Sequence, residues 1–138
     1  MPDKPTVYVV EDEPIIATTL AIILNAAGFD AMAFNSGEDC LRAAKSAPPA
    51  ILITDVSMPG IDGVELAIQF KTLHPDCKTL LLSGQASTED LLVSANKRGH
   101  YFEIIAKPVH PKELLAKIKT LSEIPSASAQ PSTTPPLL

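Results

Sequence analysis

The chain has 138 residues, of which 46% are hydrophobic and 20% are charged, and its formal net charge is −5. A chain of this length has room for one domain, and the composition is typical of a globular protein. No basic excess favours nucleic-acid binding, and no apolar run approaches the roughly 20 residues that span a bilayer. The two cysteines, Cys40 and Cys77, lack the spacing of a disulfide scaffold or metal site. We therefore expect a cytoplasmic protein with free thiols, no nucleic-acid partner and no membrane insertion.

Short runs rich in Val and Ile alternate with longer stretches at helical spacing, which is typical of repeated β–α units. The expected strands span residues 6–10, 30–34, 51–54, 79–82 and 102–106. The first, third and fourth of these runs are continuously apolar, which predicts central strands covered on both faces. The second and fifth runs are expected to flank them.

Helical spacing predicts five helices, over residues 14–27, 37–45, 63–73, 88–98 and 111–121. Pro14 suits the first turn of its helix because proline presets φ there. Ser36 and Asp39 have capping-box spacing, which predicts the start of the second helix.

After residue 123 the sequence reads IPSASAQPSTTPPLL, which has no charge, four prolines and no periodic apolar face. Such a segment cannot offset the entropy lost when it becomes ordered. We therefore expect a domain over residues 1–123 and a disordered tail over residues 124–138.

The order of the strands brings particular side chains together. Right-handed crossovers between five β–α units most often give the order 2-1-3-4-5, with helices on both faces of the sheet. The first and third strands are then neighbours, and a ligand crevice forms at their carboxyl ends. Glu11 and Asp12 follow the first strand, and Asp55 follows the third. The pattern predicts that these acids converge.

Carboxylates about 4 to 6 Å apart repel each other unless one is protonated or a cation lies between them. For Asp12 and Asp55 a divalent cation is the simpler solution, and all-oxygen ligands favour a hard ion such as Mg²⁺. The fourth and fifth strands end near Ser83 and Lys107, which are suited to bind phosphoryl oxygens. Gly84 leaves the space beside them open. The sequence thus predicts a Mg²⁺ site that handles a phosphoryl group.

Four segments, VVEDE, ITDVSMPGIDG, LLLSG and IIAKP, stand in this order at the ends of the expected strands one, three, four and five. Together they resemble the ordered motifs of receiver domains from two-component response regulators, over about residues 5–122. The resemblance implies the flavodoxin-like receiver fold, an α/β fold with a five-stranded parallel sheet of order 2-1-3-4-5 and helices on both faces.

The resemblance also implies a role for each matched acidic residue. Asp55 corresponds to the phosphoacceptor, Asp12 to a direct metal ligand, and Glu11 to the acid that acts through water. Ser57 would supply its backbone carbonyl to the metal. The implied metal is Mg²⁺.

Two further matches concern the phosphoryl group. Ser83 corresponds to the family's hydroxyl residue, which is usually Thr, and Lys107 to the phosphate-binding lysine, whose bond to Pro108 is cis in relatives. The rate of phosphoryl hydrolysis in the family is tuned at positions corresponding to Ser57 and Gln85, but this pair does not predict a lifetime.

The implied function is a phosphorylatable receiver in a two-component phosphorelay, which signals through protein contacts and turns over no small substrate. The implied partners are a sensor histidine kinase or phosphotransfer protein and an unidentified downstream protein target, and we expect a monomer or weak dimer. Of Ile15 and Ile16, which follow the acidic cluster, we expect one to pack on the sheet and the other to be exposed for a kinase helix.

Two features depart from the family pattern, of which one is an interval from Gly99 to Lys107 that is one residue longer than usual. Many receivers carry Tyr or Phe three residues before the lysine, as part of the activation switch, whereas this chain has Ile104. Phe102 shares strand parity with Ile104, so it is a candidate substitute for the aromatic residue, and a simple core role is the competing interpretation.

Three alternatives stay open at this point. The domain would act as a constitutive binding module or phosphate sink if phosphorylation drives no switch. A flavin-binding domain would use the same general sheet, but FMN phosphate needs an amide-rich loop where this chain has acids. A Mg²⁺-dependent phosphohydrolase would typically have DxD at its first strand end, whereas Val56 and Ser57 follow Asp55.

Overall fold

The computed structural model describes residues 4–84 and 88–123. Along these residues five strands alternate with five helices. The strands are β1 (Thr6–Val10), β2 (Asp30–Phe34), β3 (Ile51–Asp55), β4 (Lys78–Ser83) and β5 (Glu103–Ala106). The helices are α1 (Pro14–Ala26), α2 (Gly37–Ala44), α3 (Gly63–Leu73), α4 (Thr88–Lys97) and α5 (Pro111–Ser122). The predicted tail over residues 124–138 lies outside the described residues.

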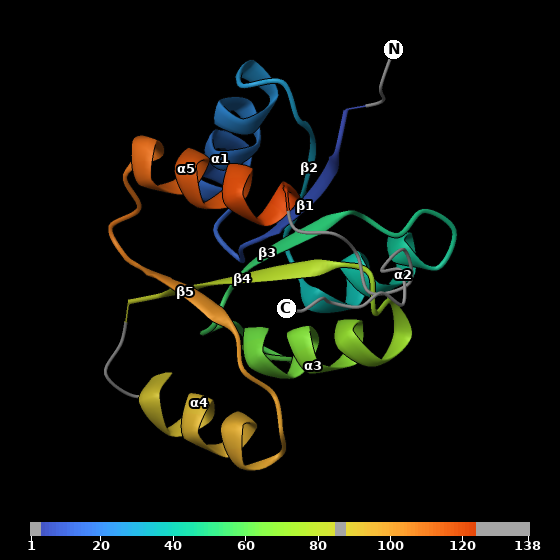
Figure 1. Ribbon diagram of the computed structural model, residues 1–138, viewed down its shortest axis with the longest axis vertical. Helices are drawn as coiled ribbons and strands as arrows, with labels where there is room; N and C mark the ends of the chain where they lie inside the picture. Colours follow the sequence, from blue (N-terminus) through green and yellow to red (C-terminus); the bar gives the residue numbers. More distant parts are fainter. Residues whose placement is uncertain (1–3, 85–87, 124–138) are drawn as a thin grey trace, which may run out of the picture.

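All five strands are parallel and pair in the order β2-β1-β3-β4-β5, which confirms the predicted topology. Helices α1 and α5 cover one face of the sheet, and α2, α3 and α4 lie on the other (Figure 1). The expected edge strands, the second and the fifth, are the two edges of this sheet.

The two faces of the sheet carry separate apolar cores because successive strand side chains point to opposite sides. On the first face, Val7, Ile53 and Leu82 pack against Leu24 of α1 and Ile118 of α5. The second face has one cluster beneath α2 and α3 and another between α3 and α4. β3 is buried throughout, which is why its sequence is an uninterrupted apolar run up to Thr54.

Several element boundaries differ from those predicted. β3 extends to Asp55, β4 extends to Ser83, and β5 begins at Glu103 instead of residue 102. Pairing across the sheet explains the longer strands, because Asp55 aligns with Leu82 and Ser83 aligns with Ala106. The amino-acid composition of one strand does not reveal which residues of the neighbouring strand it pairs with. The predicted cap of α2 is confirmed, since Ser36 Oγ accepts a hydrogen bond from the backbone N–H of Asp39.

Helix α1 presents its apolar residues differently from the expectation. Ile15 is 81% exposed, as expected for one of the isoleucine pair, but Ile16 is also 36% exposed and does not belong to the core. The phase of the helix instead turns Ala17 and Leu20 toward the sheet, where both are buried. Both isoleucines line a groove of about 390 Å³ between α1 and the segment that follows β5.

Candidate functional site

Three acidic side chains converge at the carboxyl end of the sheet. β1 leads directly into Glu11 and Asp12, and the paired strand β3 ends at Asp55. One carboxylate oxygen from each of the three lies within 4.8 Å of the others. Glu11 is 1% exposed and Asp55 is 6% exposed, so two of the acids are buried with almost no water around them. The convergence predicted from the strand order is therefore present.

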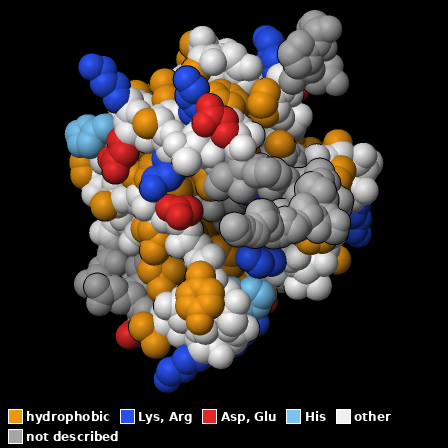
Figure 2. Space-filling view, viewed as in Figure 1, with side chains coloured by type: hydrophobic (Ala, Val, Ile, Leu, Met, Phe, Trp, Pro, Cys, Tyr) orange, Lys and Arg blue, Asp and Glu red, His pale blue; other side chains and the backbone are white. Residues whose placement is uncertain are grey.

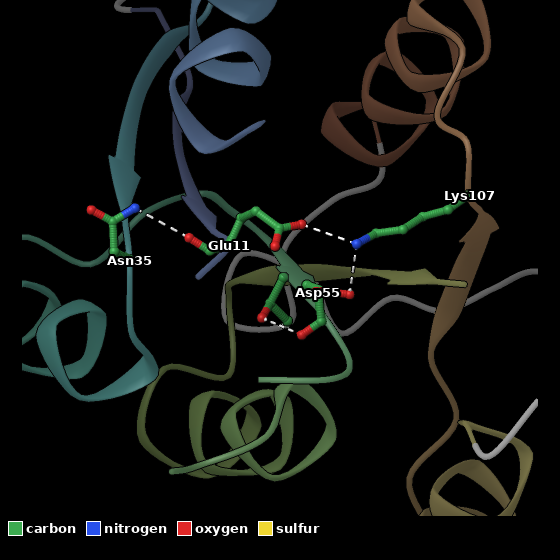
Figure 3. A network of polar contacts seen from close by, with 5 residues as sticks. Glu11, Asn35, Asp55 and Lys107 are labelled. Carbon is green, nitrogen blue, oxygen red and sulfur yellow. Dashed lines mark hydrogen bonds and ion pairs between the residues drawn. The ribbon is translucent and has the colours of Figure 1, made fainter. Parts of the chain in front are cut away.

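Lys107 reaches this cluster from the end of β5. Its Nζ lies 3.1 Å from Oε2 of Glu11 and 3.1 Å from Oδ1 of Asp55, so one ammonium bridges the two buried acids (Figure 3). The backbone N–H of Lys107 donates to the carbonyl of Ser83 at 2.8 Å, which continues the pairing of β4 with β5 by one residue. The peptide bond between Lys107 and Pro108 is cis.

The buried charges perturb one another. Burial raises the pKa of the Glu11 carboxyl to about 7, and the neighbouring Asp55 charge adds to this, although the hydrogen bond from Lys107 acts in the opposite direction. Burial lowers the pKa of the Lys107 ammonium, but its hydrogen bonds to Glu11 and Asp55 outweigh burial, so the pKa lies above its usual value. The three carboxylates thus carry more negative charge than Lys107 balances, and a further cation would reduce the repulsion between them.

The donor set at this edge fits Mg²⁺. The three carboxylates offer hard oxygen atoms, and Ser57 is exposed in the loop that follows β3, two residues after Asp55. Oxygen ligands of this kind favour Mg²⁺ over softer metals. Glu11 is also held through its main chain, because the Nδ2 of Asn35 donates to its carbonyl at 3.2 Å (Figure 3).

The remaining predicted site residues lie on the strand ends beside Lys107. Ser83 is the last residue of β4 and is half-buried. A Cβ built at Gly84 would lie 3.1 Å from Cδ of Lys107, so a glycine leaves the lysine side chain its path toward the acids. Gln85, which we associated with hydrolysis of the phosphoryl group, lies outside the described residues.

Two contacts at the backbone of Asp55 were not anticipated from the sequence. The hydroxyl of Thr54 donates to the carbonyl oxygen of Asp55 at 3.0 Å. A Cβ built at Gly63 would lie 2.0 Å from this same oxygen, so only glycine fits there. Gly63 follows Asp55 by eight positions, and a lone glycine near a helix start carries no signal in the sequence for so close an approach.

The loop between β3 and α3 has its own supports, which the sequence analysis also missed. Oε2 of Glu38, in α2, accepts from the backbone N–H of Ile61 at 3.3 Å. Asp62 caps α3 by accepting from the backbone N–H of Glu65 at 2.8 Å. The spacing of Asp62 and Glu65 matches a helix N-terminus signal, so this cap was detectable. The contact between Glu38 and Ile61 joins two segments that are 23 positions apart, so no local pattern in the sequence predicts it.

The aromatic candidate Phe102 lies outside β5 and packs, partly buried, against the cluster between α3 and α4 that includes Ala95. Its ring stacks on that of His100, with centroids 6.1 Å apart. Ile104, at the position where many receivers have an aromatic residue, is 38% exposed on β5. Phe102 therefore packs at the margin of this cluster, and the position at the surface of β5 is aliphatic.

Comparison with known proteins agrees with this fold and site. Residues 7–119 match the response regulator receiver domain family. The transcriptional regulatory protein CreB of Escherichia coli is 36% identical over 118 residues, which are 86% of this chain and 51% of CreB. The alkaline phosphatase synthesis transcriptional regulatory protein PhoP of Bacillus subtilis is 28% identical over 90% of this chain and 52% of PhoP. The chain thus spans about half the length of these two relatives.

Solved structures of receiver domains superpose well on this chain. A CheY-like receiver domain protein from Methanospirillum hungatei has a TM-score of 0.78 at 27% identity, and the match covers 88% of this chain and 96% of that one. The response regulator TrrA from Thermotoga maritima, whose structure is a complex with Mg²⁺ and a beryllium fluoride, has a TM-score of 0.73 at 30% identity, covering 85% and 98%.

The chain belongs to the response regulator receiver domain family. It is a receiver domain of the two-component type, and the cluster of Glu11, Asp12 and Asp55 fits the phosphorylation and Mg²⁺ site of such domains. Receiver domains interact with histidine kinases or phosphotransfer proteins as part of these systems. Within residues 4–84 and 88–123, no helix has the length and apolar character needed to cross a membrane.

Proposed function

We propose that Asp55 is the residue of this chain that accepts the phosphoryl group, and that Lys107 and Ser83 bind the oxygens of that group. The observation that carries the proposal is the bridge between Lys107 and Asp55, at 3.1 Å, beside two further acids. A carboxylate is a weak nucleophile, so it needs positive charge nearby to spread the negative charge of the transition state.

The reaction is a displacement at phosphorus. A carboxylate oxygen of Asp55 forms a bond to the phosphorus of a phosphohistidine on the donor protein. The phosphorus–nitrogen bond breaks, its electron pair stays on the ring nitrogen, and the donor is left with a neutral imidazole that keeps the proton on its other nitrogen. The products are an acyl phosphate on Asp55 and an unphosphorylated histidine side chain on the donor protein. Water later attacks the phosphorus of the acyl phosphate, the bond between phosphorus and the carboxylate oxygen breaks, and inorganic phosphate leaves, which restores the carboxylate of Asp55.

We further propose that this chain binds Mg²⁺ through Asp12, Asp55 and the backbone carbonyl of Ser57, with Glu11 acting through water. When bound, Mg²⁺ would neutralise charge on the carboxylates and on the phosphoryl oxygens. The protein's own side chains position and attract the phosphoryl group. Glu11 holds Lys107 in place, Lys107 attracts the phosphoryl group, and Gly84 leaves that lysine its path.

The partner that supplies the phosphoryl group must reach Asp55 with a protein surface. The groove lined by Ile15, Ile16 and Leu20 is also lined by Lys107 and Pro108, so it shares Lys107 with the proposed site. Ile15 projects from the first turn of α1 and is 81% exposed. We propose that a helix of a histidine kinase or phosphotransfer protein packs in this groove, in the cytoplasm.

The output surface is proposed to lie on α4, β5 and α5. Figure 2 shows hydrophobic side chains gathered on the side of the molecule where β5 and α4 lie. Val93 is 50% exposed, Tyr101 is 71% exposed and Ile104 is 38% exposed. Signalling through such a surface needs no turnover of a small substrate, and this binding role is the one we propose.

A decisive test uses acetyl phosphate with Mg²⁺ and detects the acyl phosphate by intact mass. The wild type is expected to gain one phosphoryl group, and Asp55→Asn and a wild-type sample treated with EDTA are expected to gain none. An unmodified wild type would overturn the proposal. Labelling of Asp55→Asn at the wild-type rate would move the acceptor to another residue.

A binding module or phosphate sink without a switch is the second candidate function. The exposed aliphatic Ile104, at the family's aromatic position, favours it. Hydrogen exchange before and after phosphorylation distinguishes the two functions. Changed protection in α4 and β5 supports a switch, whereas unchanged protection in these elements supports the sink.

A further inference from the structure

Thr54 is a polar residue in a place where an apolar one would be expected. It is fully buried, and it lies in the central strand β3 immediately before Asp55. Its neighbour Ile53 belongs to the core beneath α1 and α5. Because strand side chains alternate, the side chain of Thr54 points to the other face, beneath the helices that include α3.

A buried hydroxyl costs free energy unless it forms a hydrogen bond. The Thr54 hydroxyl meets this need by donating to the carbonyl oxygen of Asp55 at 3.0 Å. The acceptor of this bond is thus the main chain of the residue proposed as nucleophile. A valine would fill the same volume without any polar atom to satisfy, so the hydroxyl is not needed for packing.

The same carbonyl oxygen is confined from a second side. A Cβ on Gly63 would lie 2.0 Å from it, and the N–H of Gly63 donates to the carbonyl of Val56 at 2.9 Å. The first residue of α3 therefore closes against the residue after Asp55. The peptide group between Asp55 and Val56 is therefore restrained on one side by the Thr54 hydroxyl and on the other by Gly63.

We infer that Thr54 is a positioning residue for phosphoryl transfer, which acts through the backbone carbonyl of Asp55. This inference rests on the proposed function of Asp55. The side chain of Asp55 shares its Cα with the peptide group that follows it, so a rotation of the whole residue that moves the peptide group also turns the bond from Cα to Cβ, and the carboxylate at the end of the side chain moves further than the backbone. The hydroxyl of Thr54 limits this rotation and keeps Oδ1 of Asp55 at 3.1 Å from Lys107.

The consequence for the reaction is a rate effect that is separate from binding. Displacement at phosphorus requires the attacking oxygen in line with the bond that breaks, and a displacement of about 1 Å costs roughly 100-fold in rate. Thr54 touches neither the donor nor the phosphoryl group. Its loss is therefore expected to lower the maximal rate of phosphorylation while leaving the dependence on donor concentration unchanged.

The experiment uses the full chain in two matched pairs, the wild type with Thr54→Val and Thr54→Ser with Thr54→Ala. Thr54→Val keeps the shape of the wild-type residue and removes the hydroxyl. Thr54→Ser and Thr54→Ala both lose the methyl group, and only the second also loses the hydroxyl. Single-turnover phosphorylation is followed over a range of acetyl phosphate concentrations at saturating Mg²⁺, and circular dichroism gives the Tm of each variant.

We expect Thr54→Val to phosphorylate about 10-fold more slowly at saturating donor, with half-saturation unchanged. The maximal rate of Thr54→Ser is expected to lie within about 2-fold of the wild-type rate, and that of Thr54→Ala about 10-fold below that of Thr54→Ser. This second pair tests the inference even if Thr54→Val fails to fold. Equal maximal rates within each pair overturn the inference, even where the Tm falls, because a purely structural hydroxyl would change stability alone. If the wild type itself takes no label, the proposed function fails first.

Discussion

Glu11 and Lys107 are 96 positions apart in the chain, yet Nζ of the lysine lies 3.1 Å from Oε2 of the glutamate. Glu11 is almost completely buried, so this ammonium replaces much of the water that a carboxylate would otherwise have. The same ammonium is shared with Asp55. The lysine is thus held beside the proposed acceptor Asp55 by a second acid, Glu11.

Replacing this lysine should separate its chemical role from its structural one. Lys107→Met removes the charge and keeps an unbranched side chain, and we expect phosphorylation by acetyl phosphate to slow by about 100-fold, because one charged donor to the transition state is lost. The rate is measured by intact mass over time. Lys117→Met is the control, since Lys117 forms an ion pair with Glu103 at 3.1 Å on the surface. Equal rates in the two variants would exclude Lys107 from the reaction.

The glycine at the start of α3 should tolerate no side chain. A Cβ at Gly63 would meet backbone atoms of Asp55 and Val56, which have no room to move away. We expect Gly63→Ala to lower the free energy of unfolding by about 1 to 3 kcal/mol, as overpacked sites do. Urea denaturation checks this. The control is Ser94→Ala, at an exposed position of α4, which should change the free energy of unfolding little. An unaltered urea midpoint for Gly63→Ala would show that the backbone around Gly63 can make room for a side chain.

Ile15 offers a way to separate the protein donor from the chemistry. Ile15→Asp is expected to slow phosphotransfer from a histidine kinase by about 10-fold or more, because a charge would have to be buried in the apolar contact. Labelling by acetyl phosphate, which needs no docking, should keep its rate. Ile22→Asp is a matched control, because Ile22 is 62% exposed on the same helix but does not line the groove. An equal loss with both donors would place Ile15 in the chemistry instead of the docking.

The two cysteines provide a test that depends on pH. Both are buried, and burial raises the pKa of the Cys77 thiol to about 12 and also raises that of Cys40. Because the thiolate is the reactive form, the thiols of the unfolded chain, whose pKa values lie near 8.5, should be alkylated much faster at pH 8 than those of the native protein. Raising the pH to 10 should narrow this difference, because the unfolded thiols are then almost fully ionised while the thiolate fraction of Cys77 is still rising.

Alkylation by iodoacetamide, counted by mass spectrometry with and without guanidinium chloride, measures this difference. A Cys40→Ala variant isolates the response of Cys77. Rapid alkylation of the native protein at pH 8 would mean that the core beneath α2 and α3, where both thiols lie, opens on the time scale of the reaction.

Much of this protein can be derived from local patterns. The continuous apolar runs of β1, β3 and β4 predict central parallel strands, since such strands lose both faces to helices. Parallel order and crossover handedness then bring Asp12 and Asp55 to one edge, and the chain motifs at the strand ends identify the receiver family. These inferences use the period of side chains along a strand and the direction in which each strand runs, and both belong to the sequence itself.

Other features were decided only by tertiary packing. The bridge from Lys107 to Glu11, the confinement of the Asp55 carbonyl by Thr54 and Gly63, and the partial exposure of Ile16 depend on how elements approach one another to within an ångström. Strand register and helix phase set those distances, and they result from many weak contacts summed over the whole core. No single stretch of residues contains that sum, so the kinds of groups at the site follow from the sequence, while their contacts follow from the folded chain.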